Sequence, residues 1–280
     1  MVLLRKSRSM CYSIFMTGER ITASAIMDGL NTRVIGRRLL IFESISSTMV
    51  VARKEALEKA PEGTAVIAER QTAGRGRLKR AWLTPEGNIA VSIVLYPPLE
   101  CRNALIMLAS LAVLNAIQSV TGLACHLKWP NDVLIRGKKV CGVLIETKMR
   151  ADKLDYAILG IGINVNMRLA EHAEIQAIAT SLADELGKTV SRVTILRHLF
   201  IELERLYTGL LSGKLLYDEW RRNLATIGRP VTVHSGDDVS HGTAESVSED
   251  GSLLLRCEDG SLRRITIGDV SLREQTKENG

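Results

Sequence analysis

The most informative stretch of the sequence runs from Gln71 to Trp82 and reads QTAGRGRLKRAW. Its two glycines, Gly74 and Gly76, allow the backbone to approach a ligand closely and to present amides to it. Three arginines and a lysine follow within six residues, from 75 to 80. Such crowded cations repel one another unless an anion gathers them, and guanidinium groups bind phosphate and carboxylate in a bidentate manner. The stretch predicts an anion-binding loop; the alternative is an exposed basic loop that touches nucleic acid.

The composition is that of a globular protein. The 280 residues are enough for about two domains. Hydrophobic residues make up 46% and charged residues 24% of the chain, which excludes a largely disordered protein. The net charge of +6 and the isoelectric point near 9.1 suit anionic ligands but do not choose among phosphates, acidic proteins and nucleic acid.

Cysteine and histidine spacing argues against a metal site. No two of the five cysteines have CxxC spacing, and the five histidines show no metal-ligand spacing. The longest apolar stretch, around Leu105–Ile117, is interrupted by polar residues and falls short of the ~20 residues that a spanning helix needs. We also find no secretory signal. We therefore expect a cytoplasmic protein with no metal ligands and no membrane partner.

Hydrophobic periodicity predicts a central region of alternating strands and helices. We expect strands at Leu39–Phe42, Thr64–Ala68, Ile89–Leu95, Ala124–Lys128, Val133–Ile135, Val140–Thr147 and Tyr156–Val165. We expect helices at Ala23–Leu30, Ser46–Lys59, Asn103–Val120, Val193–Leu211 and Leu216–Leu224, and another before Gly187.

The pattern changes after Pro230 to short alternating strands separated by turn residues. This texture is typical of a small β-barrel or meander of about 45 residues. The expected domains are an N-terminal extension at 1–36, a catalytic domain at 37–227 and a C-terminal domain at 228–275.

Three further segments contain residues suited to chemistry. In Lys128–Asp132 (KWPND), a lysine and an aspartate four residues apart suit charge stabilisation and proton acceptance. Lys138–Glu146 begins with two lysines, and its internal Gly142 permits close approach. In Gly160–Asn166 (GIGINVN), both glycines point to one face of a strand, where something flat or bulky can pack.

Each of these segments also has a structural explanation when it is considered alone. The first is equally an ordinary turn with a surface ion pair. The second is equally a turn followed by a buried strand with both lysines solvated. The third is equally tight strand packing.

Taken in order, these segments resemble those of the biotin–protein ligase family. That family shows a serine-threonine pair, a glutamine before a GRGR loop, a KWPND segment, a lysine-led glycine strand and a GxGxN strand. The matching segments here are Ser47-Thr48, Gln71 with Gly74–Trp82, Lys128–Asp132, Lys139–Ile145 and Gly160–Asn164, and Asp269–Arg273 is similar to the end of the family's C-terminal domain. The resemblance covers about residues 37–273. It implies an α+β fold, with a mixed-sheet biotin/lipoate-ligase-like catalytic domain and a C-terminal SH3-like β-barrel.

The resemblance also implies an activity. Biotin and ATP would form biotinyl-5′-AMP and pyrophosphate, and biotin would then move to a lysine of the biotin carboxyl carrier domain of a biotin-dependent carboxylase. ATP is the co-substrate and Mg²⁺ the accompanying ion, and no tightly bound prosthetic group is expected. The carrier is the expected partner, with no nucleic acid or membrane partner. Because family members often dimerise, a homodimer is a further expectation.

Roles for individual residues follow from the same resemblance. The expected catalytic residues are Lys139, Arg77, Arg80, Lys128 and Asp132, with Asp132 accepting the proton of the incoming amine. The expected biotin-binding residues are Ser47, Thr48, Met49, Gln71, Gly74, Arg75, Gly76, Arg77, Lys139 and Gly142. The expected ATP-binding and adenylate-binding residues are Arg77, Arg80, Trp82, Asn131, Lys139, Asn164 and Arg273.

Two positions depart from the family pattern. Met49 stands where the family usually has asparagine, which puts one contact on the biotin side in question. Lys79 replaces the usual second loop glycine, so the loop loses backbone freedom and gains a cation. Arg77 and Arg80 keep their spacing.

Two other functions remain open on the sequence alone. A lipoate/octanoate–protein ligase shares the fold and the adenylation chemistry but is expected to lack the GRGR loop and the KWPND segment. A nucleic-acid-binding regulator needs a recognition helix and more charge on one face. Residues 1–36 are too short for a helix-turn-helix domain, so we expect no repressor role.

Overall fold

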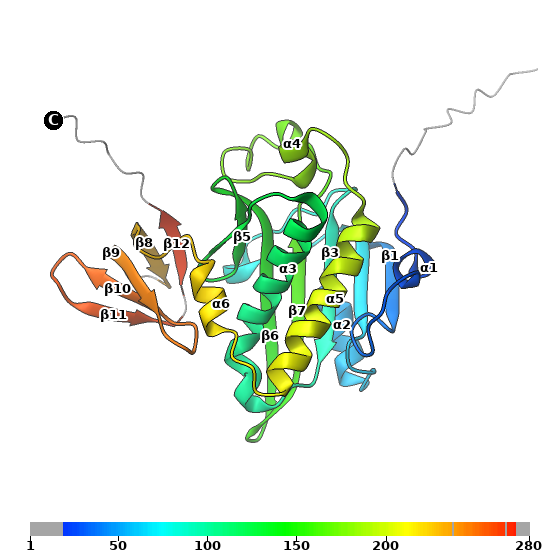
Figure 1. Cartoon of the computed structure of the whole chain (residues 1–280), viewed down its shortest axis with the longest axis horizontal. Helices are drawn as coiled ribbons and strands as arrows, with labels where there is room; N and C mark the ends of the chain where they lie inside the picture. The colour runs from blue at the N-terminus through cyan, green and yellow to red at the C-terminus, as the bar shows by residue number, and fades with distance from the viewer. Residues whose placement is uncertain (1–18, 237, 267, 273–280) are drawn as a thin grey trace, which may run out of the picture.

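A computed structural model of the chain describes residues 19–236, 238–266 and 268–272, and they form two sheets (Figure 1). The larger sheet has seven strands in the order β1-β2-β3-β7-β6-β5-β4, and the smaller has five in the order β11-β10-β9-β8-β12. In the larger sheet β1 and β2 are parallel, whereas β3 runs antiparallel to both β2 and β7. The expected α+β fold with a mixed sheet is confirmed.

The strands and helices have the following bounds. The larger sheet contains β1 (Leu39–Ile45), β2 (Ala65–Gln71), β3 (Ile89–Leu95), β4 (His126–Lys128), β5 (Asp132–Ile135), β6 (Lys138–Arg150) and β7 (Lys153–Ile163). The smaller contains β8 (Pro230–Ser235), β9 (Asp238–Val247), β10 (Leu253–Cys257), β11 (Leu262–Ile265) and β12 (Asp269–Leu272). The α-helices are α1 (Ala23–Met27), α2 (Thr48–Leu57), α3 (Leu105–Thr121), α4 (Leu182–Leu186), α5 (Arg192–Leu211) and α6 (Tyr217–Arg222), and the 3₁₀ turns are η1 (Arg77–Lys79), η2 (Leu99–Ala104) and η3 (Leu169–Glu171).

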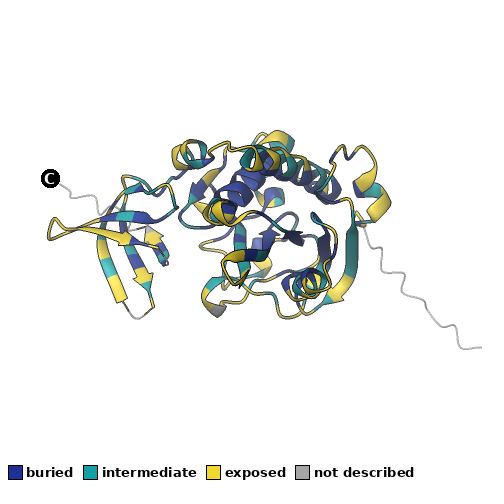
Figure 2. Cartoon of the chain, turned by 90° about the horizontal axis from the view of Figure 1, so that it is seen from below, coloured by how far each residue is buried: buried dark blue, intermediate teal, exposed yellow. Residues whose placement is uncertain are grey.

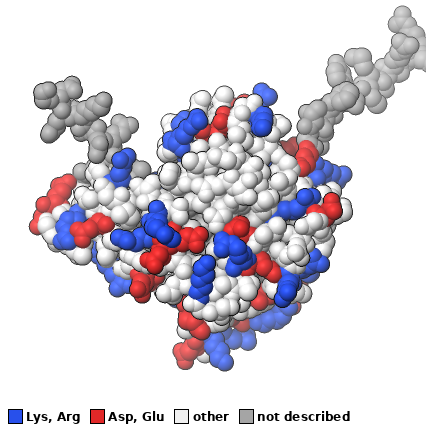
Figure 3. Space-filling model, viewed as in Figure 1, with Lys and Arg blue, Asp and Glu red and all other residues white. Residues whose placement is uncertain are grey.

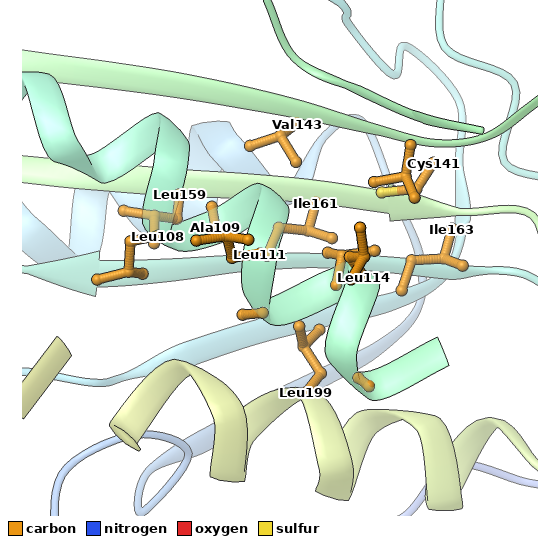
Figure 4. Packing of buried hydrophobic residues seen from close by; sticks show 14 of the residues in the cluster. Leu108, Ala109, Leu111, Leu114, Cys141, Val143, Leu159, Ile161, Ile163 and Leu199 are labelled. Atoms are coloured by element: carbon orange, nitrogen blue, oxygen red, sulfur yellow. The ribbon is translucent and has the colours of Figure 1, made fainter. Parts of the chain in front are cut away.

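Helix α3 forms the centre of the core, between the larger sheet and α5 (Figure 4). Because it is apolar on most faces, it can be buried on both sides, and the burial view shows the inner faces of these helices dark blue (Figure 2). The helix ends at Gly122, whose φ of 71° is the left-handed conformation that glycine adopts readily.

The apolar stretch around α3 is longer than the sequence analysis allowed. Together with η2 it forms a helical segment of 23 residues, Leu99–Thr121, which is long and apolar enough to cross a membrane by length and composition. The same properties suit a core helix, and most of this segment is buried inside the protein. The expectation that the stretch falls short of the spanning length is therefore wrong, because η2 extends it.

The two faces of the larger sheet differ in what covers them. Leu159, Ile161 and Ile163 of β7 belong to the core cluster that contains α3. Side chains alternate along a strand, so Gly160 and Gly162 face the other side. There α2 covers only part of the sheet, through a smaller apolar cluster formed by Met49, Ala52, Ala56, Val66, Val94, Tyr156 and Ile158.

The start of α2 differs in detail from the prediction. The helix itself is confirmed, and Ser47 is its N-cap residue, but the Ser47 side chain does not cap it. Instead, the Gln71 side-chain oxygen accepts the Thr48 N–H at 2.8 Å. A residue at the end of β2 thus satisfies a helix-terminal donor that the side chain of an N-cap serine commonly satisfies.

Strand β12 closes the smaller sheet beside β8, its first strand. Thr232 pairs with Ser271, and Val231 with Leu272. The alternating pattern after Pro230 did not distinguish β12 as a separate strand, because its pairing with β8 joins segments about forty residues apart and leaves no local signal.

A buried arginine connects the segment before β1 to the rest of the fold. Arg192, whose side chain is 4% exposed, donates to the Glu69 carboxylate and to the Glu19 main-chain carbonyl. The expected extension at 1–36 and the absence of a helix-turn-helix there concern residues 1–18 as well, which lie outside the described residues.

Replacing Arg192 with alanine should strongly destabilise the fold. The substitution leaves the carboxylate of Glu69, 17% exposed, without its partner, and breaking such a pair costs about 3–5 kcal/mol. Urea denaturation measures the change in unfolding free energy. Arg205→Ala is the matched control, because its ion pair with Glu202 is partly exposed and such pairs contribute about 0–1 kcal/mol. Equal losses in the two variants would contradict the prediction.

Candidate active site

A cavity of about 970 Å³ lies on the face of the larger sheet that α2 leaves open. Its walls come from the start of α2, the loop between β2 and β3, strands β5 to β7 and the chain between β7 and α4. Residues of the smaller sheet complete it, namely His234, Gly236, Asp269, Val270 and Ser271.

The floor of this cavity is made of small residues. Gly162 lies between Ala90 of β3 and Gly142 of β6. A Cβ atom at Gly162 would lie 2.3 Å from Nε1 of Trp82, and one at Gly160 would lie 2.5 Å from Sδ of Met49. A side chain at Gly162 would collide with the Trp82 ring and one at Gly160 would displace Met49, and the expectation that a flat or bulky group packs on this face is confirmed.

Hydrogen-bonding side chains gather at one end of the floor. The Thr48 hydroxyl donates to the Gln71 side-chain oxygen at 3.1 Å and accepts from the Ser92 hydroxyl at 2.8 Å. The Gln71 amide nitrogen donates to the Thr84 hydroxyl at 3.0 Å. Because these groups are largely buried and hold one another, they form a fixed polar corner suited to a small ligand with both donors and acceptors.

The predicted anion-binding loop is closed on itself. The Gly76 N–H donates to the Arg80 carbonyl at 2.8 Å, and the Trp82 N–H donates to the Gly74 carbonyl at 3.0 Å. A Cβ atom at Gly74 would lie 2.4 Å from the Trp82 carbonyl oxygen, so glycine is required there. Leu78, at the tip, has a φ of 52°, which is left-handed for a residue with a side chain.

Two arginines of the loop reach the rest of the protein. Arg77 donates to the Asn131 side-chain oxygen at 3.1 Å and to the Gly268 carbonyl at 2.9 Å, and Arg80 forms an ion pair with Asp269. Burial lowers the pKa of Arg77, against the effect of the Asp269 and Asp132 carboxylates. The guanidinium remains a cation at neutral pH.

The two lysines at the start of β6 point to opposite faces of the strand, Lys139 into the cavity and Lys138 to solvent. Lys139 Nζ lies 2.6 Å from Oδ1 of Asp132 and 5.3 Å from the centre of the Trp82 ring. Lys138 is exposed and donates to the Gln176 carbonyl at 3.2 Å. The alternative in which both lysines are solvated is wrong, because strand alternation turns one of them into the cavity.

The KWPND segment is more than a surface turn. Trp129 is buried, and its indole N–H donates to the Gly251 carbonyl of the smaller sheet at 2.8 Å. The Asn131 amide nitrogen donates to the Val143 carbonyl at 2.7 Å. Lys128 and Asp132 both line the cavity, and Asp132 forms its ion pair with Lys139 of β6, so this segment is not a turn with an ion pair on the outer surface.

Asn164 also lines the cavity, and it is nearly fully buried. Its side-chain amide donates to the Thr180 carbonyl at 3.1 Å, and its main-chain N–H donates to the Val140 carbonyl at 2.8 Å. It therefore holds the chain after β7 against the cavity. Its expected contact with adenine stays a prediction.

The charge of the lining is strongly positive. Five cationic side chains and two carboxylates line the cavity, and both carboxylates are ion-paired to lining cations. By contrast, the face that carries α3 and α5 shows charges of both signs interspersed (Figure 3). The cavity is thus suited to anions more negative than a single carboxylate.

Comparison with known proteins places this site in a family. Residues 41–164 match the biotin/lipoate A/B protein ligase family, and residues 226–273 match the biotin protein ligase C-terminal domain. The bifunctional ligase/repressor BirA of Bacillus spizizenii is 36% identical over 93% of this chain and 82% of its own length. The chain belongs to the biotin protein ligase family. The biotin–[acetyl-CoA-carboxylase] ligase of Paracoccus denitrificans is 34% identical over 72% of this chain and 89% of its own.

A solved structure of a family member has the same fold. The biotin protein ligase of Aquifex aeolicus in complex with biotin and ATP superposes with a TM-score of 0.71 at 31% identity. The match covers 85% of this chain and 99% of that one. The match to a C-terminal ligase domain agrees with the expected SH3-like C-terminal domain.

The cavity of this biotin protein ligase family member brings most of the predicted site residues together. One exception is Gly74, which supports Trp82 and Gln71 and is not among the cavity-lining residues. Arg273 lies outside the described residues. The lining residues that were predicted are Ser47, Thr48, Met49, Gln71, Arg75, Gly76, Arg77, Arg80, Trp82, Lys128, Asn131, Asp132, Lys139, Gly142 and Asn164.

Two parts of the lining were missed by the sequence analysis. The chain between β7 and α4 contributes Ile175, Ala177, Ile178 and Ala179, for which no motif gave a signal. Asp269 of the smaller sheet also lines the cavity. It belongs to the segment Asp269–Arg273 that resembles the family, but a role in binding was expected only for Arg273.

Replacing Gly162 with alanine should displace the Trp82 indole, because the new Cβ atom would lie far inside contact distance of the ring. We expect a red-shifted tryptophan emission and a loss of about 1–3 kcal/mol of stability. Trp129 and Trp220 are both 1% exposed, so the spectral change reports on Trp82. Gly209→Ala in α5 is the control, since its Cβ atom meets Lys214 at an ordinary 3.4 Å. An unchanged emission spectrum in the Gly162 variant would contradict the contact.

Proposed function

We propose that this protein is a biotin–protein ligase, which activates biotin with ATP and transfers it to a lysine of a biotin carboxyl carrier domain. The observation that carries the proposal is the single cavity that joins the Thr48–Gln71 polar corner to a wall of cations. Support comes from relatives named for this activity and from the Aquifex aeolicus structure with biotin and ATP. The carrier protein and a cytoplasmic homodimer belong to the proposal.

In the first step the biotin carboxylate attacks the α-phosphate of ATP, a C–O–P linkage forms and pyrophosphate leaves. Two anions must meet, so fixed cations have to offset their repulsion and the charge of the transition state. Arg75, Arg77, Arg80 and Lys139 line the cavity and supply these cations. Lys128 adds a fifth.

Biotin has a ureido head and an apolar ring and tail. We place the head at the polar corner, where Thr48 and Gln71 offer hydroxyl and amide groups. The ring then lies against Met49 and the glycine floor, and the tail leads to Lys139. At position 49 the thioether offers an apolar surface in place of the amide that the family usually has.

The adenylate is proposed to bind near Trp82 and Asn164. The indole lies against Gly142 and Gly162 and is partly exposed, so it offers an aromatic surface on which an adenine ring can stack. Asn131 holds Arg77 beside the phosphates through its side-chain oxygen.

In the second step a lysine amine of the carrier attacks the acyl carbon, the acyl–phosphate bond breaks and AMP leaves. The amine must be neutral when it attacks, and it loses a proton as the amide forms. Asp132 is the proposed acceptor of this proton. Asp132 is paired with Lys139 at 2.6 Å, and phosphate binding would draw Lys139 away and release the carboxylate.

Magnesium is proposed to arrive on the ATP phosphates. Among the described residues there is no group of three histidine, cysteine, aspartate or glutamate side chains that could hold a metal ion. Magnesium commonly keeps several waters and binds substrate phosphates with one or two carboxylates, so Asp132 is the candidate carboxylate in the cavity. When bound, the ion would neutralise phosphate charge.

Transfer of labelled biotin tests the proposed function. The purified protein, ATP, Mg²⁺ and a carrier domain should give labelled carrier, and omission of ATP or chelation of Mg²⁺ should prevent labelling. A carrier whose acceptor lysine is changed to arginine is the control. Labelling with octanoate or lipoate but not with biotin would overturn the proposal in favour of the related lipoate ligases.

Replacing Arg77 with alanine should release the reactive intermediate. This guanidinium is largely buried in the cavity wall, and bonds of charged donors to phosphate are among the strongest in proteins. We expect biotinyl-5′-AMP to dissociate at least ~10-fold faster, as measured by gel filtration of preformed complex. Arg263→Ala, in the exposed part of β11, is the control. Unchanged retention in the Arg77 variant would show that the loop does not hold the adenylate.

A further inference from the structure

Asp269 opens strand β12 and faces the cavity from the smaller sheet. Its carboxylate forms the ion pair with Arg80, while the carbonyl of the preceding residue, Gly268, accepts from Arg77 at 2.9 Å. Gly268, just before β12, and Asp269, its first residue, therefore hold two arginines that belong to the loop between β2 and β3.

The ion pair has little to do with stability. The Arg80 side chain is 68% exposed and that of Asp269 is 25% exposed, and exposed pairs contribute little to the folding free energy. What the pair does is restrict the Arg80 side chain, which otherwise samples many rotamers in solvent. A guanidinium carries five N–H donors in a planar fork, so it can serve a carboxylate and a phosphate together.

Arg77 depends on the same carboxylate in another way. Its guanidinium has lost much of its hydration, and this burial lowers its pKa. The charge of Asp269 is the largest of the influences that oppose this shift. Asp269 thus favours a charged Arg77 inside the wall as well as an ordered Arg80 at its edge.

We propose that Asp269 is a positioning residue for ATP, which holds Arg80 and Arg77 in the cavity wall where the nucleotide phosphates bind. This inference rests on the proposed function. A carboxylate repels phosphate directly, so Asp269 can assist the nucleotide only through the two arginines. The smaller sheet would then form part of the nucleotide site through a side chain that does not touch the substrate.

The test is steady-state kinetics of biotinyl-5′-AMP formation by the full-length protein. Asp269→Asn should raise the KM for ATP about tenfold, with the KM for biotin unchanged and kcat changed less than the KM for ATP. Asp269→Glu, which keeps the charge, should recover part of this loss. Glu245→Gln is the matched control, because it breaks an exposed pair with Arg256 in the same sheet and should leave both KM values unchanged.

A double-mutant cycle with Arg80→Ala separates positioning from other effects. If Asp269 acts through Arg80, its replacement should have a much smaller effect in the Arg80→Ala background than in the wild-type protein. Full additivity of the two effects would overturn the inference. A lower KM for ATP in Asp269→Asn would also overturn it, because the carboxylate would then compete with the phosphates.

Failure of the inference is distinguishable from failure of the proposed function. If the wild-type protein forms biotinyl-5′-AMP and Asp269→Asn has the same KM for ATP, only the role of Asp269 is refuted. If the wild-type protein forms no adenylate from biotin, the proposed function is refuted first. Thermal unfolding of each variant identifies any loss that comes from misfolding.

Discussion

Close contact between side chains and bare backbone sets the geometry of the whole site. Gly142, Gly160 and Gly162 expose the main chain of β6 and β7, and the side chains of Trp82 and Met49 lie directly on it. One face of these strands is covered by α3, and the other has glycines in place of side chains. The glycine face forms the floor of a cavity of about 970 Å³, and the walls of the site stand around it.

The walls differ in how firmly they are held. The polar corner belongs to regular elements, since Thr48 begins α2 and Gln71 ends β2. The cationic wall belongs to a loop that depends on its own hydrogen bonds and on contacts with Asn131 and Gly268. A corner built on regular elements suits a ligand that must be recognised by fixed hydrogen bonds, whereas a wall of cations suits phosphates whose charge changes during the reaction.

The sequence predicted elements with strong local patterns and missed interactions between distant segments. Strand Ile89–Leu95 has the predicted bounds, because its residues are apolar apart from Ser92 and are buried on both faces. The capping of Thr48 by Gln71 joins residues 23 positions apart, and the pairing of Arg80 with Asp269 spans most of the catalytic region. Such contacts leave no periodic signal. The GRGR and KWPND segments were recognisable only through resemblance to a family, since each had an ordinary structural explanation alone.

The methionine at position 49 shows how a departure from the family pattern can be absorbed by its surroundings. Its side chain packs with Val66, Val94 and Ile158 in a hydrophobic cluster and also lies on Gly160. An asparagine at this buried position would have to find partners for its amide, because an unpaired buried polar group is costly. Thr48 and Gln71 already supply hydrogen-bonding groups at this end of the cavity. With methionine at position 49 the apolar part of the site is larger, and Thr48 and Gln71 still supply its polar part.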